Sequence, residues 1–239
     1  KNQGEALDYD NPMQGFQTEF VMNTYALGSI ITREMYDDDQ YNYIKQVPKM
    51  LARSMRHSEE VLATAVINDA YTTGINGADG VTLFNASHPM VGGGTFSNIL
   101  ATAADISQTS LEQIMIDIDS AVDDRNLKIM LRPKPLLVHP TFKYQAEKLM
   151  TTPQIVGSAN NDRNPLMGSL KVISNPYLSD TDQWQVFTDC PNGLSFYWRN
   201  KPELDRDNDF DSKNLKFSIW ARFDVGFTDP RLGWGSPGA

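Results

Sequence analysis

The longest amphipathic pattern in the chain runs from Asp38 to Thr72. Its apolar residues recur at the three- and four-residue spacing of a one-sided helix, namely Ile44, Val47, Leu51, Met55, Leu62, Ala65 and Val66. Asp37, Asp38 and Asp39 stand where carboxylates offset the positive end of the helix dipole. Because Pro48 removes an amide donor, we expect the helix over 38–72 to bend near Val47 or to begin there.

A second long pattern lies near the end of the chain. Apolar residues occupy every second position over Leu215, Phe217, Ile219, Ala221, Phe223, Val225 and Phe227. This alternation predicts a strand of roughly 43 Å at about 3.3 Å per residue. A long helix and a long strand, each apolar on one side, bury those sides best against one another. We therefore expect an elongated α+β subunit built on this pair.

Shorter elements are predicted between the two long ones, in a compact α/β lobe over 109–205. Thr109 and Glu112 have the spacing of a capping box, which predicts a helix over 109–124. Pro140 suits the first position of a third helix. Residues 189–193 contain Pro and Asn-Gly and predict a hairpin turn. Strands are expected over 16–31, 127–131, 136–138, 172–174, 184–188 and 194–198.

Composition narrows the range of functions. The chain has 21 basic and 30 acidic residues and a net charge of −9, which argues against a nucleic-acid binder over its whole surface. Its single cysteine, Cys190, excludes an internal disulfide and favours synthesis in a reducing cytoplasm. Apolar runs fall short of the roughly 20 residues that span a membrane. Because the chain opens with Lys1, we expect residues ahead of it to be missing or removed.

Two charged patterns stand out. We name Lys45, Lys49, Arg53 and Arg56 the basic stripe, because they share the helix face opposite the apolar one. This face is either solvated or directed at phosphate or at an acidic neighbouring subunit. We name Glu203, Asp205, Asp207, Asp209 and Asp211 the acidic run.

The acidic run has three possible explanations: a solvated loop, an intersubunit contact with basic residues, or a cation site. A calcium loop requires Gly at its sixth position and an acid at its twelfth, where Phe210 and Lys216 stand.

Catalytic motifs are lacking. His57, His88 and His139 have no second ligand at metal-like spacing, so structural roles are expected and no metal or cofactor is predicted. A hydrolase using His88 with Asp79 or Asp105 would lack a nucleophile. Cys190 has no nearby activating group and is expected to be inert. The chain is therefore not expected to be an enzyme.

Five short motifs follow one another along the chain: Gly15-Phe16-Gln17-Thr18, Ile31-Thr32-Arg33-Glu34-Met35, His88-Pro89-Met90-Val91-Gly92-Gly93, Ala159-Asn160-Asn161-Asp162 and Thr228-Asp229-Pro230-Arg231. In this order the chain resembles the major capsid (head) proteins of tailed bacteriophages, in particular the Mu-like head subunit group. The resemblance covers nearly the whole chain.

The resemblance implies the Hong Kong 97-type capsid fold. It assigns residues 1–30 to part of the extended E-loop and residues 31–108 to the peripheral domain, with a spine helix over 38–72. It assigns 109–205 to the axial domain and 206–239 to the return into the peripheral domain with the long strand. The N-terminal arm of the family is expected ahead of this sequence, either cleaved, disordered or omitted. Lys1 and Asn2 lack the motif of the lysine–asparagine cross-link found in some members.

The implied function is structural. Many copies, as hexamers and pentamers, would assemble into an icosahedral virion head around double-stranded DNA, touched weakly and without sequence preference. Scaffold, portal or decoration proteins are possible partners, no membrane is involved, and synthesis would occur in the bacterial host cytoplasm. The alternative is an encapsulin-like nanocompartment that encloses protein cargo.

Overall fold

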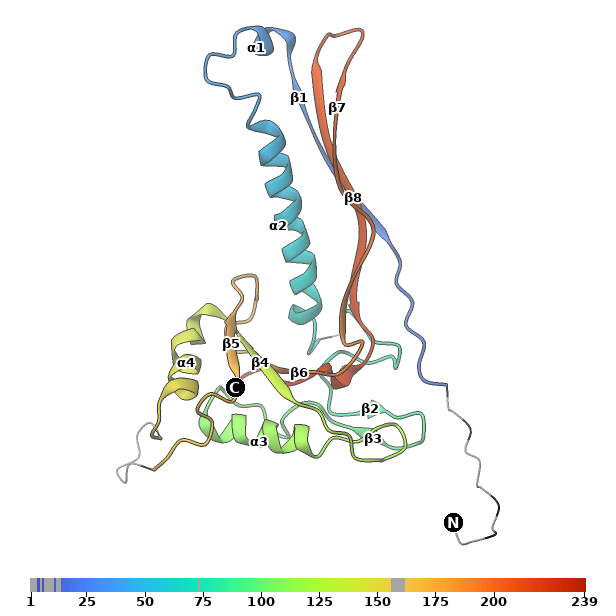
Figure 1. Cartoon of the computed structure of the whole chain (residues 1–239), viewed down its shortest axis with the longest axis vertical. Helices are drawn as coiled ribbons and strands as arrows, with labels where there is room; N and C mark the ends of the chain where they lie inside the picture. The colour runs from blue at the N-terminus through green and yellow to red at the C-terminus, as the bar shows by residue number, and fades with distance from the viewer. Residues whose placement is uncertain (1–3, 5, 7–10, 12–13, 73, 156–161) are drawn as a thin grey trace.

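The computed structural model describes the chain except for residues 1–3, 5, 7–10, 12–13, 73 and 156–161. Its described part forms a long arm and a lobe at one end of the arm (Figure 1). The arm pairs one long helix with a three-stranded sheet and carries a short helix at its far end, whereas the lobe packs helices α3 and α4 on a four-stranded sheet. This arrangement matches the expected elongated α+β subunit.

The long helix of the arm is α2, Val47–Asn68. It is shorter than the expected 38–72 and begins at the position that Pro48 allows, because a proline in the first turn costs no helical hydrogen bond. A short helix, α1 (Arg33–Asp37), precedes it. Asp39 does not cap α2 but accepts backbone N–H bonds from Tyr41, Tyr43 and Ile44 in the intervening loop.

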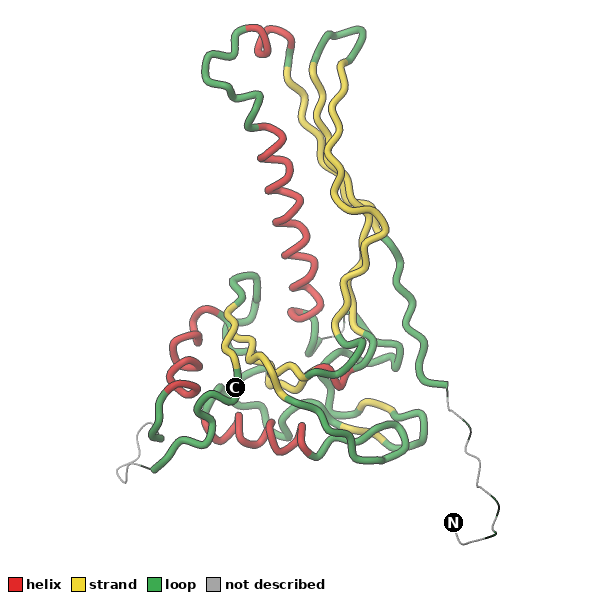
Figure 2. The backbone as a smooth tube through the Cα atoms, viewed as in Figure 1, coloured by secondary structure: helices red, strands yellow, loops and turns green. Residues whose placement is uncertain are grey.

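The arm sheet has the order β1-β8-β7 (Figure 2). The central strand β8, Leu215–Phe227, has the predicted bounds and is antiparallel to both neighbours, β1 (Asn23–Ile31) and β7 (Leu194–Asn208). Its alternate residues from Leu215 to Phe223 are buried in one cluster with Val47, Leu51 and Met55 of α2. The predicted packing of helix against strand is therefore confirmed.

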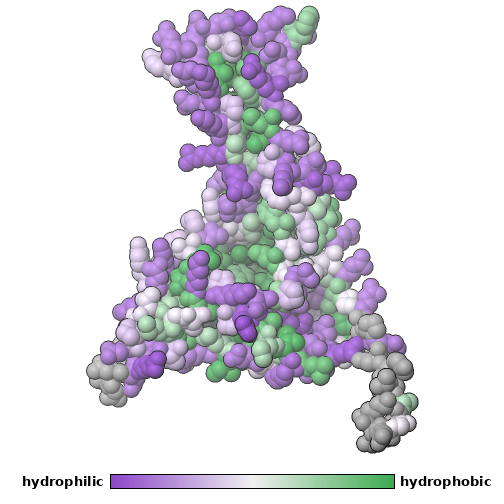
Figure 3. Space-filling view, viewed as in Figure 1, coloured by the Kyte–Doolittle hydropathy of each residue, from purple (hydrophilic) through white to green (hydrophobic). Residues whose placement is uncertain are grey.

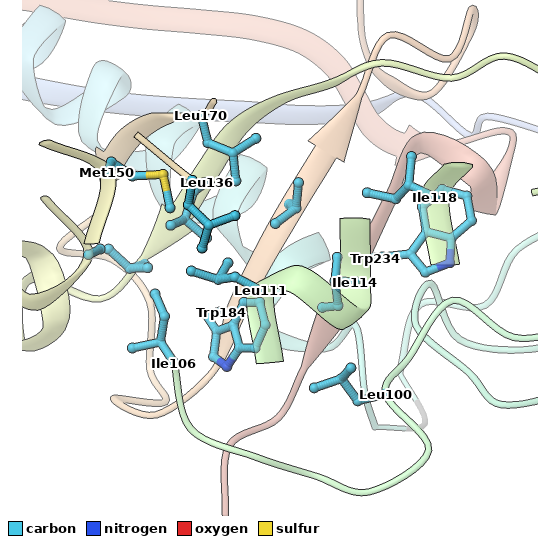
Figure 4. Close-up of a cluster of buried hydrophobic side chains, with 14 of the residues drawn as sticks. Leu100, Ile106, Leu111, Ile114, Ile118, Leu136, Met150, Leu170, Trp184 and Trp234 are labelled. Carbon is cyan, nitrogen blue, oxygen red and sulfur yellow. The ribbon is translucent and has the colours of Figure 1, made fainter. Parts of the chain in front are cut away.

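The lobe sheet has the order β5-β4-β6-β9. Its strands are β4 (Pro133–Val138), β5 (Lys171–Ser174), β6 (Trp184–Thr188) and β9 (Gly233–Ser236). Two helices pack on it, α3 (Gln108–Asp119) and α4 (Lys143–Thr151). The core between them gathers Leu111, Ile114 and Ile118 of α3 with Trp184 and Trp234 of the sheet (Figure 4).

Four short elements complete the fold. They are β2 (His88–Pro89), β3 (Thr95–Phe96), η1 (Pro140–Phe142) and η2 (Pro230–Leu232).

Apolar surface shows in Figure 3 chiefly where the arm meets the lobe, whereas the far end of the arm is mostly hydrophilic.

The hairpin expected over 184–198 is wrong. Strand β6 pairs with β4 and β9 in the lobe, and β7 pairs with β8 in the arm. Residues 189–193 turn as predicted, with Asn192 at φ 58°, but they lead from one sheet to the other. A turn signal specifies the local backbone, whereas the pairing partner depends on which apolar face a strand can reach.

Other local expectations also need correction. Helix α3 is capped by Ser107 with Ser110, two residues before the expected cap at Thr109. Residues 127–131 form no strand. Strand β4 contains Pro133 and Pro135, and a bulge between Pro133 and Leu136 accommodates them. The strand expected from Phe16 begins at Asn23.

The boundaries between arm and lobe along the chain differ from the expected domain bounds. Residues 194–205, expected in the lobe, lie in β7 of the arm, and residues 233–236, expected in the returning arm, form β9 of the lobe. Within the expected E-loop 1–30, residues 23–30 belong to the arm sheet. Residues 159–161 of the asparagine motif lie outside the described residues.

Candidate assembly surfaces

The basic stripe lies on the exposed side of the arm. Lys49, Arg53 and Arg56 project from α2 on the side away from the apolar seam with β8, and Lys45 lies in the turn before the helix. All four are exposed. Arg56 Nη1 donates to Glu59 Oε2 at 2.5 Å. The structure therefore brings the four cations along one edge of the arm, as the spacing predicts.

Glu59 is a buried acid that the sequence reasoning missed. It follows Val47, Leu51 and Met55 at four-residue spacing and lies on the same buried face, with only 4% of its surface exposed. One carboxylate oxygen pairs with Arg56, and the other, Oε1, has no hydrogen-bond partner among the described residues. The four-residue spacing from Val47 through Met55 was the available signal, but an acid at the next position does not continue an apolar pattern.

The acidic run is not a loop throughout. Glu203, Asp205 and Asp207 belong to the edge strand β7 and stand opposite Trp220, Ser218 and Lys216 of β8. Since the alternate residues of β8 are buried against α2, these three acids face away from the helix. Charges on an exposed edge strand also oppose edge-to-edge association of sheets.

The last two acids of the run, Asp209 and Asp211, lie in the turn between β7 and β8. Asp209 Oδ2 accepts from Lys216 Nζ at 3.0 Å. This hydrogen bond, followed by one from Ser212, lowers the pKa of Asp209 below its usual value. Asp209 is therefore a fixed anion at the distal end of the arm.

His88 forms a buried polar cluster in the lobe. Its Nδ1 lies 2.6 Å from Asp79 Oδ2, and its Nε2 lies 3.2 Å from Asn98 Oδ1. Asn98 Nδ2 donates to the carbonyls of Leu83 and Pro230, so its oxygen is turned toward the imidazole. The cluster links Asp79 and His88 to Pro230 of η2 through Asn98.

This geometry brings together the His88–Asp79 pair considered for a hydrolase. However, the position that a nucleophile would take beside Nε2 is held by an amide oxygen. Asp105 instead accepts from the backbone of Ala239. The other two histidines also have structural contacts: His139 caps η1, and His57 of α2 lies with its Nδ1 3.2 Å from the hydroxyl of the distant Tyr177.

The remaining candidate chemistry is limited in the described part of the chain. Burial, and then the nearby Asp229 carboxylate, raise the pKa of the Cys190 thiol to about 12. Among the described residues, no three His, Cys, Asp or Glu side chains are grouped to hold a metal ion. No described helix combines the length and apolarity needed to cross a membrane.

Comparison with known proteins identifies the family. A family model described as phage capsid protein matches residues 16–234. The chain belongs to this family of phage capsid proteins. The match runs through both the arm and the lobe, so it covers every element from β1 to the Trp234 position in β9. No curated protein sequence matches this capsid protein.

Solved structures show that the capsid protein has the Hong Kong 97-type fold. The capsid of the cyanophage P-SCSP1u matches with a TM-score of 0.58 and 10% identity, over 98% of this chain and 80% of that one. The capsid of bacteriophage JBD30 matches with a TM-score of 0.56 and 15% identity, over 74% of this chain and 80% of that one.

An encapsulin shares the same fold. The SrpI encapsulin complex from Synechococcus elongatus matches with a TM-score of 0.53 and 8% identity, over 91% of this chain and 74% of that one. At such identity a structural match shows the fold alone.

Proposed function

We propose that this chain is the major capsid protein of a tailed phage, a structural protein whose many copies assemble into an icosahedral head. The observation that carries this proposal is the family match over residues 16–234 of a subunit with a long, thin arm. Such a shape exposes extensive surface to neighbours, and many weak contacts become collectively strong in a shell. The proposed role is structural rather than catalytic.

Domain roles follow from the resemblance to the fold family. We assign the arm to the peripheral domain, with α2 as its spine helix, and the part of the lobe within residues 109–205, which includes most of α3 and all of α4 and β4–β6, to the axial domain. The segment before β1 is assigned to the E-loop. Membership of the Mu-like head subunit group rests on the short sequence motifs.

We further propose that the copies form hexamers and pentamers and enclose double-stranded DNA. The net charge of −9 suits a container that must not hold its cargo tightly while DNA is packaged. Scaffold, portal or decoration proteins are further proposed partners, with synthesis in the bacterial host cytoplasm. An electron micrograph of the purified protein tests the assembly directly: only small monodisperse subunits under all conditions would contradict it.

The basic stripe is proposed to face the shell interior or the acids of a neighbouring copy. Charge reversal of two stripe residues, K49E/R53E, should impair assembly or DNA retention. The matched control K148E/K171E makes the same charge change on exposed residues of the lobe. Full particles of normal yield from K49E/R53E would contradict the assignment.

The acidic run is proposed to lie at an intersubunit boundary. In an assembled structure, Asp205 and Asp207 should then approach basic side chains of another copy. The idea is wrong if the run faces solvent and lies further than a Debye length, about 10 Å at 0.1 M salt, from any basic neighbour.

An encapsulin-like nanocompartment is the second candidate, favoured by the structural match to an encapsulin. Both candidates predict closed particles in a micrograph. Their contents distinguish them, because phage heads yield nuclease-sensitive nucleic acid after rupture, whereas a nanocompartment yields a protein cargo. Absorbance at 260 nm and mass spectrometry of ruptured particles therefore decide between the two.

A further inference from the structure

Helix α1 and the turn from β7 to β8 lie at the same distal end of the arm (Figure 1). Residues of both line a basic pocket. Its volume is about 390 Å³, and its walls include the basic side chains of Arg33, Arg206 and Lys213. Tyr36 and Phe210 add aromatic walls. We name this cavity the tip pocket. None of its three cations belongs to the basic stripe.

Strand alternation explains how a basic residue from the acidic run reaches the pocket. Arg206 stands opposite the buried Phe217, so it lies on the face of the sheet that points toward α2. Asp205 and Asp207, its neighbours in sequence, lie on the other face. One strand thus presents acids on its outer face and a guanidinium in the pocket.

Two cations that line the tip pocket have no ion-pair partner among the described residues, and the neighbouring acids Asp207 and Asp211 do not line it. Arg33 Nε bonds to Asp37 Oδ2 at 2.9 Å, and Asp209 bonds to Lys216 at 3.0 Å, so these two pairs are each neutral. Arg206 and Lys213 are exposed and form no ion pair with a described residue. Two positive charges therefore remain in the pocket of a chain whose net charge is −9.

We propose that the tip pocket binds a phosphate group. A phosphate monoester carries about −1.5 to −2 charges at pH 7, which matches the two unbalanced cations, whereas a single carboxylate would neutralise only one. The planar donor fork of a guanidinium fits phosphate oxygens with two parallel hydrogen bonds, and the lysine adds a point charge.

The aromatic side chains of the pocket would distinguish inorganic phosphate from a phosphate carried by a flat organic group. The Phe210 ring is 81% exposed, and Lys213 Nζ lies 4.2 Å from its centroid, so a flat organic group could stack there beside a bound phosphate. Free inorganic phosphate would use the cations alone. A nucleoside monophosphate would use the cations and the ring.

Calorimetric titration of the full chain at low ionic strength tests the proposal with inorganic phosphate and with a nucleoside monophosphate. We expect saturable binding that weakens at least about tenfold in R206Q and in K213N, because each removes one charge-assisted contact. Lys213 has φ 58°, and asparagine tolerates this left-handed conformation, so K213N removes the charge without adding strain. R199Q, an exposed arginine of β7 outside the pocket, is the matched control.

Each outcome bears on the proposal. Retained binding in R199Q with weaker binding in R206Q and K213N supports it. Tighter binding of the nucleoside monophosphate than of inorganic phosphate also supports it, provided that F210A removes this difference in affinity. Equal affinity for both anions supports the pocket and assigns it to inorganic phosphate. Failure of both anions to bind saturably, or equal weakening by R199Q, overturns it. Assembly defects in R206Q without any phosphate binding would reassign the pocket to a subunit contact and also overturn it.

Discussion

Replacing Glu59 by methionine should stabilise the subunit. Glu59 occupies a position on the buried face of α2 that is otherwise apolar, and its Oε1 is buried without a partner among the described residues. Leaving such an oxygen unsatisfied costs about 1–3 kcal/mol. Methionine has a similar length and a similar helix propensity. It would also place an apolar end beside Phe196 and Trp198, which line a cavity of about 200 Å³ together with Glu59.

The ion pair lost with the carboxylate offsets only part of this gain. Arg56 is the sole partner of Glu59 among the described ion pairs, and its side chain is 72% exposed. Because the Arg56 end of the pair remains in solvent while the Glu59 end is buried, we assign the pair about 1 kcal/mol, the upper end of the range for surface pairs. We therefore expect E59M to raise the free energy of unfolding by about 1 kcal/mol, within a range of about 0–2 kcal/mol, because a gain of about 1–3 is offset by a loss of about 1.

Urea unfolding of unassembled subunits measures this gain, with an unchanged dependence on denaturant as evidence that the two-state behaviour is preserved. E60M is the matched control, because Glu60 is the exposed neighbour and its replacement should change the unfolding free energy by less than about 0.5 kcal/mol. A loss of more than about 1 kcal/mol in E59M alone would refute the reasoning, since it would mean that the buried carboxylate stabilises the fold.

Three further predictions concern other parts of the molecule. L51A should cost about 2–5 kcal/mol in urea unfolding because Leu51 is buried in the seam with β8, whereas M50A on the exposed side should cost little. Cys190 should react slowly with thiol reagents at pH 8, and a rate equal to that of free cysteine would contradict its raised pKa. The Asp209–Lys216 contact should be present above the ordinary carboxyl pKa of 3.8 and should be lost as the pH falls below that value. An NMR titration of the Asp209 carboxyl should therefore give a midpoint below 3.8.

The long seam of the arm could be predicted because both of its periods are local. Residues three to four apart on α2 and two apart on β8 report directly which side each element buries. The bounds of β8 were right for this reason. The start of α2 was already restricted by Pro48, but the three aspartates before it suggested a longer helix, and Asp39 in fact stabilises a loop.

The rest depended on contacts between distant segments. The acids of β7 looked like a solvated loop because an edge strand with one exposed face has the same composition as a loop. The partners of β6 come from residues 133–138 and 233–236, which no local turn can indicate. The tip pocket joins Arg33 to Arg206 and Lys213, so it exists only once β1 and β7 are placed on either side of β8.

The arm itself shows why a single copy is incomplete. One helix covers the middle of the three-stranded sheet: Ile219 on the central strand is 4% exposed, whereas its partners in register on the two edge strands, Leu27 and Leu204, are 48% and 47% exposed. All three face the same side of the sheet, since residues directly opposite each other in paired strands share a face. Burying both leucines within the chain would require a further helix on each side of α2, but α2 is the only long helix of the described arm. Apolar surface therefore remains on both flanks of the seam, where a neighbouring copy in a shell gains most by packing.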